Sequence, residues 1–330
     1  MTRYEPVPLP TGAAEASRAE VTAGVVGWVC APPLRDLVAA FGGGLPDRLP
    51  PAELLEWLDG FSAVYWDFRS RSGSVERDEI NVSELPPETV ELVGAAATAL
   101  GLVEPRPAPT HRYDHLLVLG GLARSCLHRT AYAAELVRGG DVTVDEVAAL
   151  GSFRPLRPAE TADLDLPESP GAPLGYEVDV MDVGIRLGFG YAEPAEERAS
   201  TGPITHHSWA VRSYRPADGP PVHVLAAPST EPESRRAHTS DTYHFWADEV
   251  RPAAGDRVLV VTSQLYVPFQ HCDAVRSLRF GYGCRVDTVG LDPARLGATG
   301  GTGPQRYAPH QYLQEIRSTV RSMRNLLGAA

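Results

Sequence analysis

The sequence predicts an α/β protein with a Rossmann-like, mainly parallel sheet, helices on both faces and a helical N-terminal region. Up to about residue 105, apolar residues recur only at helical spacing. After that point, short apolar runs closed by glycine alternate with segments of helix length, which is typical of a parallel sheet with right-handed crossovers. The Pro-rich segment EPRPAPTHR (104–112) separates the two patterns. We therefore expect a helical region over 1–105 and an α/β domain over 106–330.

The N-terminal region is expected to contain helices only. Pro50-Pro51 and Pro86-Pro87 precede the last two of them, and proline is favoured in the first turn of a helix. The glycine- and proline-rich stretch FGGGLPDRLPP breaks the pattern between the second and third. The expected helices cover 19–32, 33–41, 51–68 and 86–103. We interpret this region as a lid or a dimer surface, so a homo-oligomer is left open.

The second region contains strands and helices in alternation. The expected strands are 115–121, 142–152, 221–229, 257–264 and 284–290. The expected helices are 125–140, 175–189, 241–251, 268–283 and 309–327. Two further stretches are interpreted as loops, a Pro-rich acidic surface excursion over 157–175 and a glycine-rich mobile loop over 296–306.

Composition excludes several function classes. All 30 basic residues are arginine, so lysine Schiff bases, pyridoxal-phosphate catalysis, the phosphate-loop lysine and the kinase lysine are ruled out. The net charge of −12 argues against a nucleic-acid partner. No apolar stretch reaches the roughly 18 residues of a membrane helix, and the polar N-terminus is unlike a secretory signal. We expect a cytoplasmic protein with no membrane partner, whose four widely spaced cysteines are reduced.

Familiar catalytic motifs are missing. The sequence contains no GxGxxG, GxSxG or HExxH, which lowers the odds of a dinucleotide-binding enzyme, an α/β-hydrolase and a zincin. His206 and His207 are adjacent, so on a strand they point to opposite faces. No metal is therefore expected. A metal-dependent hydrolase that uses histidines together with Asp241 is the weakest hypothesis.

Ligands of open α/β sheets bind beyond the carboxyl ends of the strands. Here that rule selects four loops, at 120–129, 151–154, 227–242 and 262–270. They contain glycines, hydroxyls and arginines, which suit a polar and anionic small molecule. The candidate ligand-binding residues are Gly120, Gly121, Arg124, Arg129, Gly151, Ser152, Arg154, Ser229, Arg236, Thr239, Ser240, Thr242, Ser263, Gln264, Tyr266 and Gln270.

Glu177 and Asp241 are the candidate catalytic acid and base, because they are the carboxylates expected near these loops. Arg235 is a further anion-binding candidate. The alternatives remain open at each position. Asp241 or Ser240 would also serve as a helix cap, and Glu177 would also fit a solvated helix surface.

The order of these pieces resembles the ElyC/SanA/YdcF family, also called DUF218, over about residues 113–327. The matching pieces are HLLVLGGLARSCLHRTAYAAELV with Arg129, then ALGSFRPL, then GYEVDVM with Glu177 and Met181, then HTSDTYHF, then VTSQLY. The resemblance implies a Rossmann-like domain that binds a nucleotide-like or S-adenosylmethionine-like molecule or acts in envelope polymer metabolism. Two positions depart from it. Tyr266 stands where the family often has histidine, and Phe269-Gln270 follow Pro268 where an arginine is usual.

Two functions are carried forward from the sequence. The first is an enzyme, a hydrolase or transferase, that acts on a nucleotide-, S-adenosylmethionine- or sugar-like molecule at the carboxyl ends of the strands. The second is a binding or regulatory module with the same pocket and no reaction. The cofactor stays unidentified, with S-adenosylmethionine or a nucleotide as the ligand that the resemblance implies.

Overall fold

The computed structural model describes residues 4–68, 85–162, 164, 174–216, 219–295 and 307–329. The chain forms two compact units. The first, here called the helical unit, consists of Met1–Arg106, Gln264–Arg276 and Gln305–Ala330. The second, the sheet unit, consists of Pro107–Ser263 and Ser277–Pro304. The break near residue 106 lies beside the predicted boundary, but two later segments that the sequence assigned to the α/β domain belong to the helical unit.

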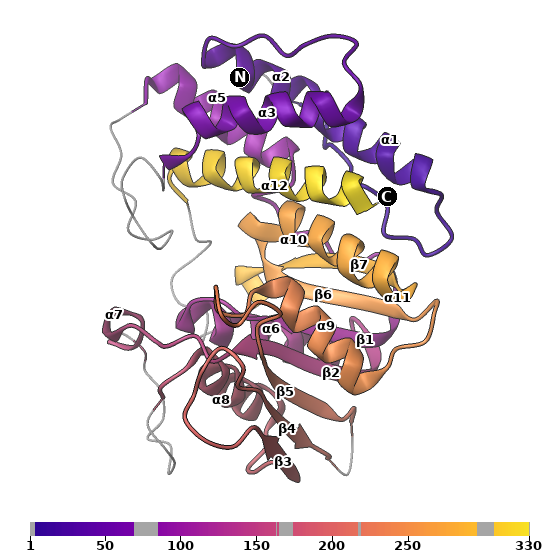
Figure 1. Cartoon of the computed structure of the whole chain (residues 1–330), viewed down its shortest axis with the longest axis vertical. Helices are drawn as coiled ribbons and strands as arrows, with labels where there is room; N and C mark the ends of the chain where they lie inside the picture. Colours follow the sequence, from indigo (N-terminus) through magenta and orange to yellow (C-terminus); the bar gives the residue numbers. More distant parts are fainter. Residues whose placement is uncertain are drawn as a thin grey trace. The chain divides into compact units, whose positions relative to one another are not determined.

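The helical unit contains α1 (Arg18–Val29), α2 (Pro32–Ala40), α3 (Pro51–Tyr65), α5 (Pro87–Ala99), α10 (Val267–Ala274) and α12 (Pro309–Ala329) (Figure 1). Helix α1 begins with a capping box in which Ser17 and Glu20 satisfy each other's backbone N–H groups. Its buried Trp28 donates to the carbonyl oxygen of Leu100. Arg317 of α12 is tied to Asp59 of α3 by an ion pair of 2.9 Å, so helices from both ends of the chain build one unit.

The sheet unit has seven strands in the order β3-β4-β5-β2-β1-β6-β7. They are β1 (Arg112–Leu119), β2 (Thr143–Ser152), β3 (Glu196–Ala199), β4 (Ala210–Tyr214), β5 (Val222–Ala227), β6 (Arg257–Ser263) and β7 (Arg285–Leu291). The pairs from β5 to β7 are parallel, whereas β3 and β4 pair antiparallel. The connecting helices are α6 (Ala123–Arg138), α7 (Pro158–Thr161), α8 (Glu177–Phe189), α9 (Thr239–Val250) and the short α11 (Phe280–Tyr282). The α/β prediction with a mainly parallel sheet is confirmed.

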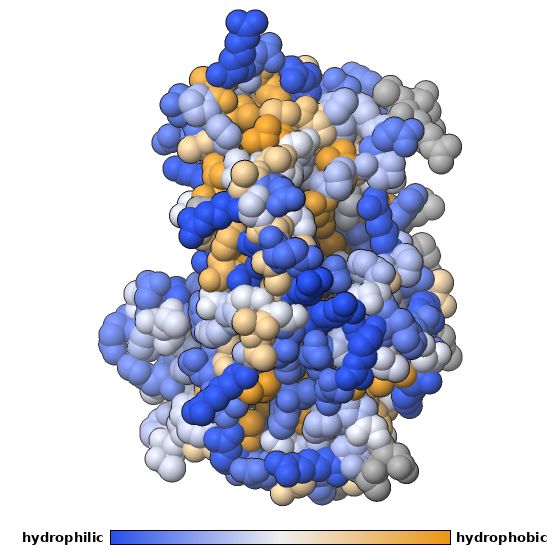
Figure 2. Space-filling view, turned by 90° about the vertical axis from the view of Figure 1, so that its right-hand side faces the viewer, coloured by the Kyte–Doolittle hydropathy of each residue, from blue (hydrophilic) through white to orange (hydrophobic). Residues whose placement is uncertain are grey.

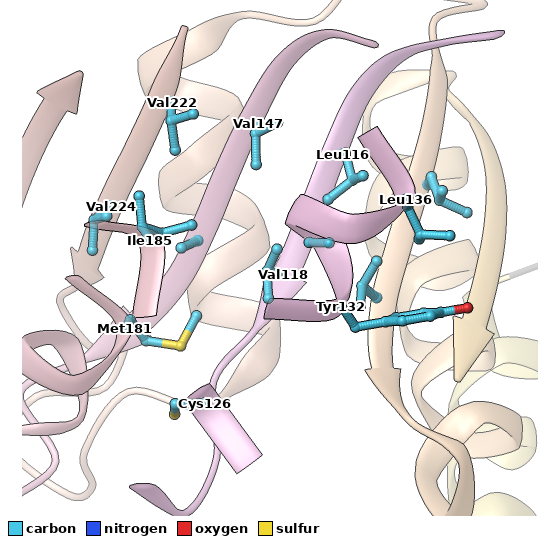
Figure 3. Packing of buried hydrophobic residues seen from close by; sticks show 14 of the residues in the cluster. Leu116, Val118, Cys126, Tyr132, Leu136, Val147, Met181, Ile185, Val222 and Val224 are labelled. Carbon is cyan, nitrogen blue, oxygen red and sulfur yellow. The ribbon is translucent and has the colours of Figure 1, made fainter. Parts of the chain in front are cut away.

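One face of the sheet is apolar and packs against α6 and α8. Leu116, Val118 and Val147 of the central strands belong to one buried cluster with Met181 and Ile185 of α8 (Figure 3). All five side chains are fully buried. Branched residues at alternate strand positions fit this pleated surface, and their burial is the main favourable contribution to the stability of this unit.

The opposite face is covered by α9, which lies in front of the sheet in Figure 1. It carries ionisable side chains. His115 of β1 meets the ring of Trp246 of α9 edge to face and its Nε2 lies 3.1 Å from Asp256. Glu146 of β2 lies 3.9 Å from His115 and 3.9 Å from His223. The two faces are therefore chemically different. The face of His115 combines ionisable side chains with buried apolar residues such as Leu117 and Val260, whereas the other face is apolar.

Two parts of the chain differ from the sequence prediction. Strands β3 and β4 were not predicted, since β3 is exposed along its whole length and β4 has only five residues. The helix expected over 268–283 is divided into α10, a π-helical turn at Val275–Arg279 and α11. The expected mobile loop at 296–306 and most of the excursion at 157–175 lie outside the described residues.

The two units also differ at their surfaces. Figure 2 shows more apolar surface over the helical unit, the upper part of that view, than over the sheet unit. Val64 and Tyr65, at the end of α3, are 62% and 39% exposed. In the described part of the chain, no helix is both long and apolar enough to cross a membrane.

Candidate functional site

The loops after β1 and β2 meet at the carboxyl edge of the sheet, around Glu177. This residue is the first of α8, and its backbone N–H donates to the carbonyl oxygen of Arg154 at 2.9 Å. Its side chain accepts a hydrogen bond of 2.7 Å from the hydroxyl of Ser152, the last residue of β2. Arg154 places its Nε 3.9 Å from the same carboxylate. We call Ser152, Arg154, Glu177 and Arg129 the Glu177 cluster.

Glu177 is a buried acid. Only 8% of the residue is exposed, and burial raises its pKa above the ordinary 4.5, although Arg154, Ser152, Arg236 and Arg129 act in the opposite direction. Burial therefore outweighs the arginines. A carboxyl group whose pKa is raised by burial is suited to general acid catalysis.

Arg129 joins the ends of β1 and β6. The residue is buried, and its guanidinium donates to the carbonyl oxygens of Leu119 and Gly120 and to the hydroxyl of Ser263. The bond from Nε to Ser263 Oγ is 3.1 Å long. Where two adjacent strands diverge, their last carbonyl groups have no hydrogen-bond donor on the neighbouring strand. A buried guanidinium can donate hydrogen bonds to these carbonyl groups instead. Arg129 thus fixes the shape of the edge at which β1 and β6 end.

Glycines let the backbone approach Glu177. A Cβ at Gly120 would lie 2.7 Å from Glu177 Oε1 and 2.9 Å from the carbonyl oxygen of Leu150. At Gly121 it would lie 3.2 Å from Arg129 Nη1. At Gly151 a Cβ would lie 3.4 Å from the Cα of Val178 in α8, which is an ordinary contact. The close packing therefore depends on the missing side chain at Gly120 and, less strongly, at Gly121.

Cys126 lies in the first turn of α6, a few residues after the end of β1. Its thiol donates a hydrogen bond to the carbonyl oxygen of Gly121. Burial, together with the negative charge of Glu177, raises its pKa to about 12 despite the nearby arginines. A thiol with this pKa is not ionised at neutral pH, so Cys126 is a poor nucleophile.

Two residues that sequence reasoning missed complete the cluster. Glu160, in the four-residue helix α7, forms a two-bonded ion pair with Arg154, with distances of 2.8 and 2.9 Å. Arg157 Nε donates to the same carboxylate at 3.2 Å. Both lie in the Pro-rich stretch that was interpreted as a surface excursion, and no motif there signals a site. The one available signal was the position of this Pro-rich stretch, which begins directly after the loop that follows β2.

The loop after β5 holds Asp241 in a different environment. Asp241, only 2% exposed, accepts hydrogen bonds from the hydroxyl of Thr230 at 2.6 Å, from the backbone of His238 at 2.8 Å and from the Arg235 guanidinium. Burial alone would raise the pKa of Asp241, but these bonds outweigh it and hold the pKa well below 3.8. Asp241 is the third residue of α9 and accepts the backbone N–H of His238, the N-cap residue, in a capping box. Its catalytic role stays a prediction.

The other predicted residues divide between three places. Ser229 accepts a hydrogen bond from Arg235, and Thr242 donates to the carbonyl oxygen of Thr239. Both belong, with Ser240, to the loop and first turn of α9. Arg236 acts on Glu177 by its charge, while Arg124 is exposed on α6.

Gln264, Tyr266 and Gln270 lie in the helical unit. Gln264 Nε2 donates to the carbonyl oxygen of Gly101 at 2.7 Å, and Tyr266 packs its ring edge against Phe269. Gln270 is buried in α10. The structure does not bring these three residues together with the Glu177 cluster within one unit.

Metal-binding arrangements are not found among the residues that the structure describes. His207 lies 3.0 Å from Glu233 in an exposed pair, and His206 bonds to the carbonyl oxygen of Pro232. A surface hollow of about 330 Å³ is lined by Arg215 and His223 among others. It lies at the amino end of β5, away from the Glu177 cluster.

Comparison with known proteins identifies the family. Residues 12–101 match the model of the Rv3785 N-terminal domain. The Mycobacterium tuberculosis protein Rv3785 is 31% identical over 323 residues, which cover 91% of this chain and 87% of that protein. The Mycobacterium bovis protein Mb3814 matches equally well. No solved structure matches the chain.

The resemblance to the ElyC/SanA/YdcF family is therefore wrong, because the family model and these relatives point elsewhere. The residues that suggested it are a glycine turn after one strand, small residues after the next and hydroxyls at a helix start. Any parallel α/β sheet needs such residues at its carboxyl edge, for tight turns and helix caps. From its similarity along nearly its whole length, the chain belongs to the Rv3785 family.

Proposed function

We propose that the chain is an enzyme, a hydrolase or transferase, that binds an anionic small molecule at the carboxyl edge of the sheet. The observation that carries this proposal is Glu177, a buried carboxyl group with a raised pKa that lies among arginines. Perturbed acids with specific charged neighbours are concentrated at functional sites. Glu177 also occupies the edge at which open α/β sheets bind their ligands.

The roles follow from the geometry. Glu177, held by Ser152 at 2.7 Å, would donate its proton to a leaving group or take one from an attacking hydroxyl. Arg154 and Arg236 would balance the negative charge of the ligand, since arginine is the strongest basic partner that this lysine-free chain offers. Proton transfer by a positioned group typically contributes about 10²–10⁴-fold in rate.

The ligand class that we propose is a nucleotide-like or sugar-phosphate-like molecule, since both carry the negative charge that the arginines would balance. The parallel strands, numbered in chain order, have the order 3-2-1-4-5, the order of Rossmann-like sheets, which bind such ligands where the order reverses. This reversal lies between β1 and β6, the two strands whose ends Arg129 joins. The Rossmann-like assignment and the ligand class are parts of the same proposal.

A thermal-shift screen with nucleotides, S-adenosylmethionine and sugar phosphates tests ligand binding, because a ligand of the native state raises the melting temperature. Hits are then incubated with the wild type and with Glu177→Gln, and the products are separated. We expect the variant to bind its hit and to lose about 10²–10⁴-fold in turnover. Glu193→Gln, which breaks an exposed pair with Arg186, is the matched control.

The results distinguish this enzyme from a binding or regulatory module. Equal turnover in wild type and Glu177→Gln would remove the catalytic role of Glu177. A hit that is never converted would favour the module, in which Glu177 only shapes the pocket. If no compound stabilises the wild type, the proposed ligand class is wrong.

A further inference from the structure

The carboxylate of Glu160 lies directly over the turn between β1 and α6. Its Oε2 accepts hydrogen bonds from the backbone N–H of Ala123, the first residue of α6, at 3.2 Å and from Arg154 Nη2 at 2.9 Å. Its Oε1 accepts from Arg154 Nη1 at 2.8 Å and from the side chain of Arg157 at 3.2 Å. The side chain is only 3% exposed. The chain thus brings a buried anion to the start of a helix of 16 residues.

The groups around this carboxylate suit an anion of higher charge. Arg154 offers a planar pair of donors, Arg157 a third donor and the start of α6 a backbone N–H with the positive end of the helix dipole. Arg154 also donates to the carbonyl oxygen of Gly121 at 2.8 Å, which keeps its fork in place without Glu160. These donors belong to three different groups, Arg154, Arg157 and the backbone of Ala123. The two oxygens of the Glu160 carboxylate accept the hydrogen bonds from all of them.

The charges favour the same conclusion. Arg129, Arg154, Arg157 and Arg236 lie around two carboxylates, Glu160 and Glu177. Since the pKa of Glu177 is raised, Glu160 is the more fully ionised of the two acids. If Glu160 moved away, this group of described residues would be left strongly positive. A dianion at the same place would restore the balance.

We propose that the Glu160 carboxylate occupies the binding position of a ligand phosphoryl group, and that a phosphate-bearing ligand displaces it. This inference rests on the proposed function and narrows its ligand to phosphate-bearing molecules. A phosphoryl group has three terminal oxygens, one for each direction of approach. When it binds, Glu160 exchanges Arg154 for water and also leaves the backbone N–H of Arg157, so α7 loses the bond that closes its first turn. Glu160 is therefore an autoinhibitory group within the phosphate subsite.

Binding of inorganic phosphate and pyrophosphate by calorimetry tests this inference with the full chain. Glu160→Gln keeps the size of the side chain and removes the charge that competes with the ligand. We expect it to bind pyrophosphate about tenfold or more tightly than the wild type, because the competent state is no longer in equilibrium with the blocked one. Arg154→Met is expected to lose this binding. Glu193→Gln, which breaks an exposed glutamate–arginine pair, should bind as the wild type does.

A second measurement does not depend on the variant's folding. Hydrogen exchange in the wild type reports the backbone N–H of Ala162, which bonds to the carbonyl oxygen of Pro158. We expect saturating pyrophosphate to speed its exchange, because the departing Glu160 carboxylate gives up the backbone N–H of Arg157 that closes the first turn of α7, and the turn then opens more often.

Three outcomes would overturn the inference. These are equal or weaker pyrophosphate binding by a folded Glu160→Gln, unchanged exchange at Ala162 with bound pyrophosphate, and no phosphate or pyrophosphate binding by either protein. None of them decides the proposed function, which fails separately if the small-molecule screen finds no ligand or Glu177→Gln keeps its turnover.

Discussion

The end of β2 and the end of β5 each lead to a buried carboxylate in the first turn of a helix, and the two carboxylates ionise in opposite ways. Glu177 has few direct hydrogen-bond donors, so burial dominates and raises its pKa. Asp241 receives donors from Thr230, Arg235 and His238, so its pKa is lowered. Two buried carboxylates at equivalent strand ends therefore have different chemistry. Desolvation favours the protonated acid, whereas hydrogen bonds and positive charges aimed at the carboxylate favour the anion.

The largest effect is expected from Asp241→Ala, which should destabilise the protein by about 3 kcal/mol, because Arg235 loses its buried partner and the capping box of α9 loses its bond to His238. Urea unfolding measures this. Asp248→Ala on the exposed side of the same helix is the control, with an expected change within about 0.5 kcal/mol. A loss for Asp241→Ala no larger than that of the control would mean that the donors around Asp241 contribute nothing.

Gly120→Ala is expected to cost about 2 kcal/mol, because the new methyl group has to push aside Glu177 and a backbone carbonyl oxygen. Gly121→Ala provides the matched comparison, since its methyl group meets the end of the Arg129 side chain, 3.2 Å away. We expect a smaller loss there. Thermal denaturation of both variants measures the difference, and the reverse order would contradict the close approach of Gly120 to Glu177.

Glu177→Gln is expected to become more stable relative to the wild type as pH rises. Because the folded pKa of Glu177 lies above its ordinary 4.5, the native state binds more protons than the unfolded state between these two values. Wild-type stability attributable to Glu177 is therefore complete below 4.5 and is lost as pH rises through the folded pKa. The loss is about 1.4 kcal/mol for each unit of difference, and glutamine does not titrate.

Urea unfolding of both proteins from pH 4 to 8 measures this difference. Asp241 has the opposite sign, because its lowered pKa supplies stability above 3.8 that disappears in acid. A constant difference between Glu177→Gln and wild type across this range would show that Glu177 ionises normally.

The smallest effect is expected from Thr230→Ala, which removes one donor of 2.6 Å from Asp241 and should cost about 1 kcal/mol. Thr230→Ser keeps the hydroxyl and should recover most of the loss. If serine and alanine at this position are equally destabilising, the lost methyl group rather than the hydrogen bond is responsible.

Much of the fold could be predicted from the sequence, because buried parallel strands appear as apolar runs. RVLVVTS, for instance, forms β6 with six buried residues in succession. The edge strand β3 could not be predicted in this way. Its sequence EERA is exposed throughout, so its pairing with β4 depends on backbone hydrogen bonds that leave no apolar signal.

The site was predicted in part for a similar reason. Parallel strands place their carboxyl ends at one edge, so Ser152, Glu177 and Ser263 could be expected there before their contacts were known. Glu160 and Arg157 could not, since the ion pair with Arg154 depends on how the chain folds back after β2. The sequence also could not predict that Gln264 belongs to the helical unit. Amphipathic spacing shows that a helix has a buried face, but not which helices cover it.

The helical unit includes α12 at the far end of the sequence, and this has a consequence for synthesis. A ribosome that has made the first hundred residues has made α1, α2, α3 and α5, but not the helix that supplies Arg317 to Asp59. The described sheet strands are translated before α12. The helical unit therefore stays incomplete until α12 has been made. A recombinant fragment that stops after the segment matching the family's N-terminal domain would meet the same problem, with apolar faces that lack their last helix.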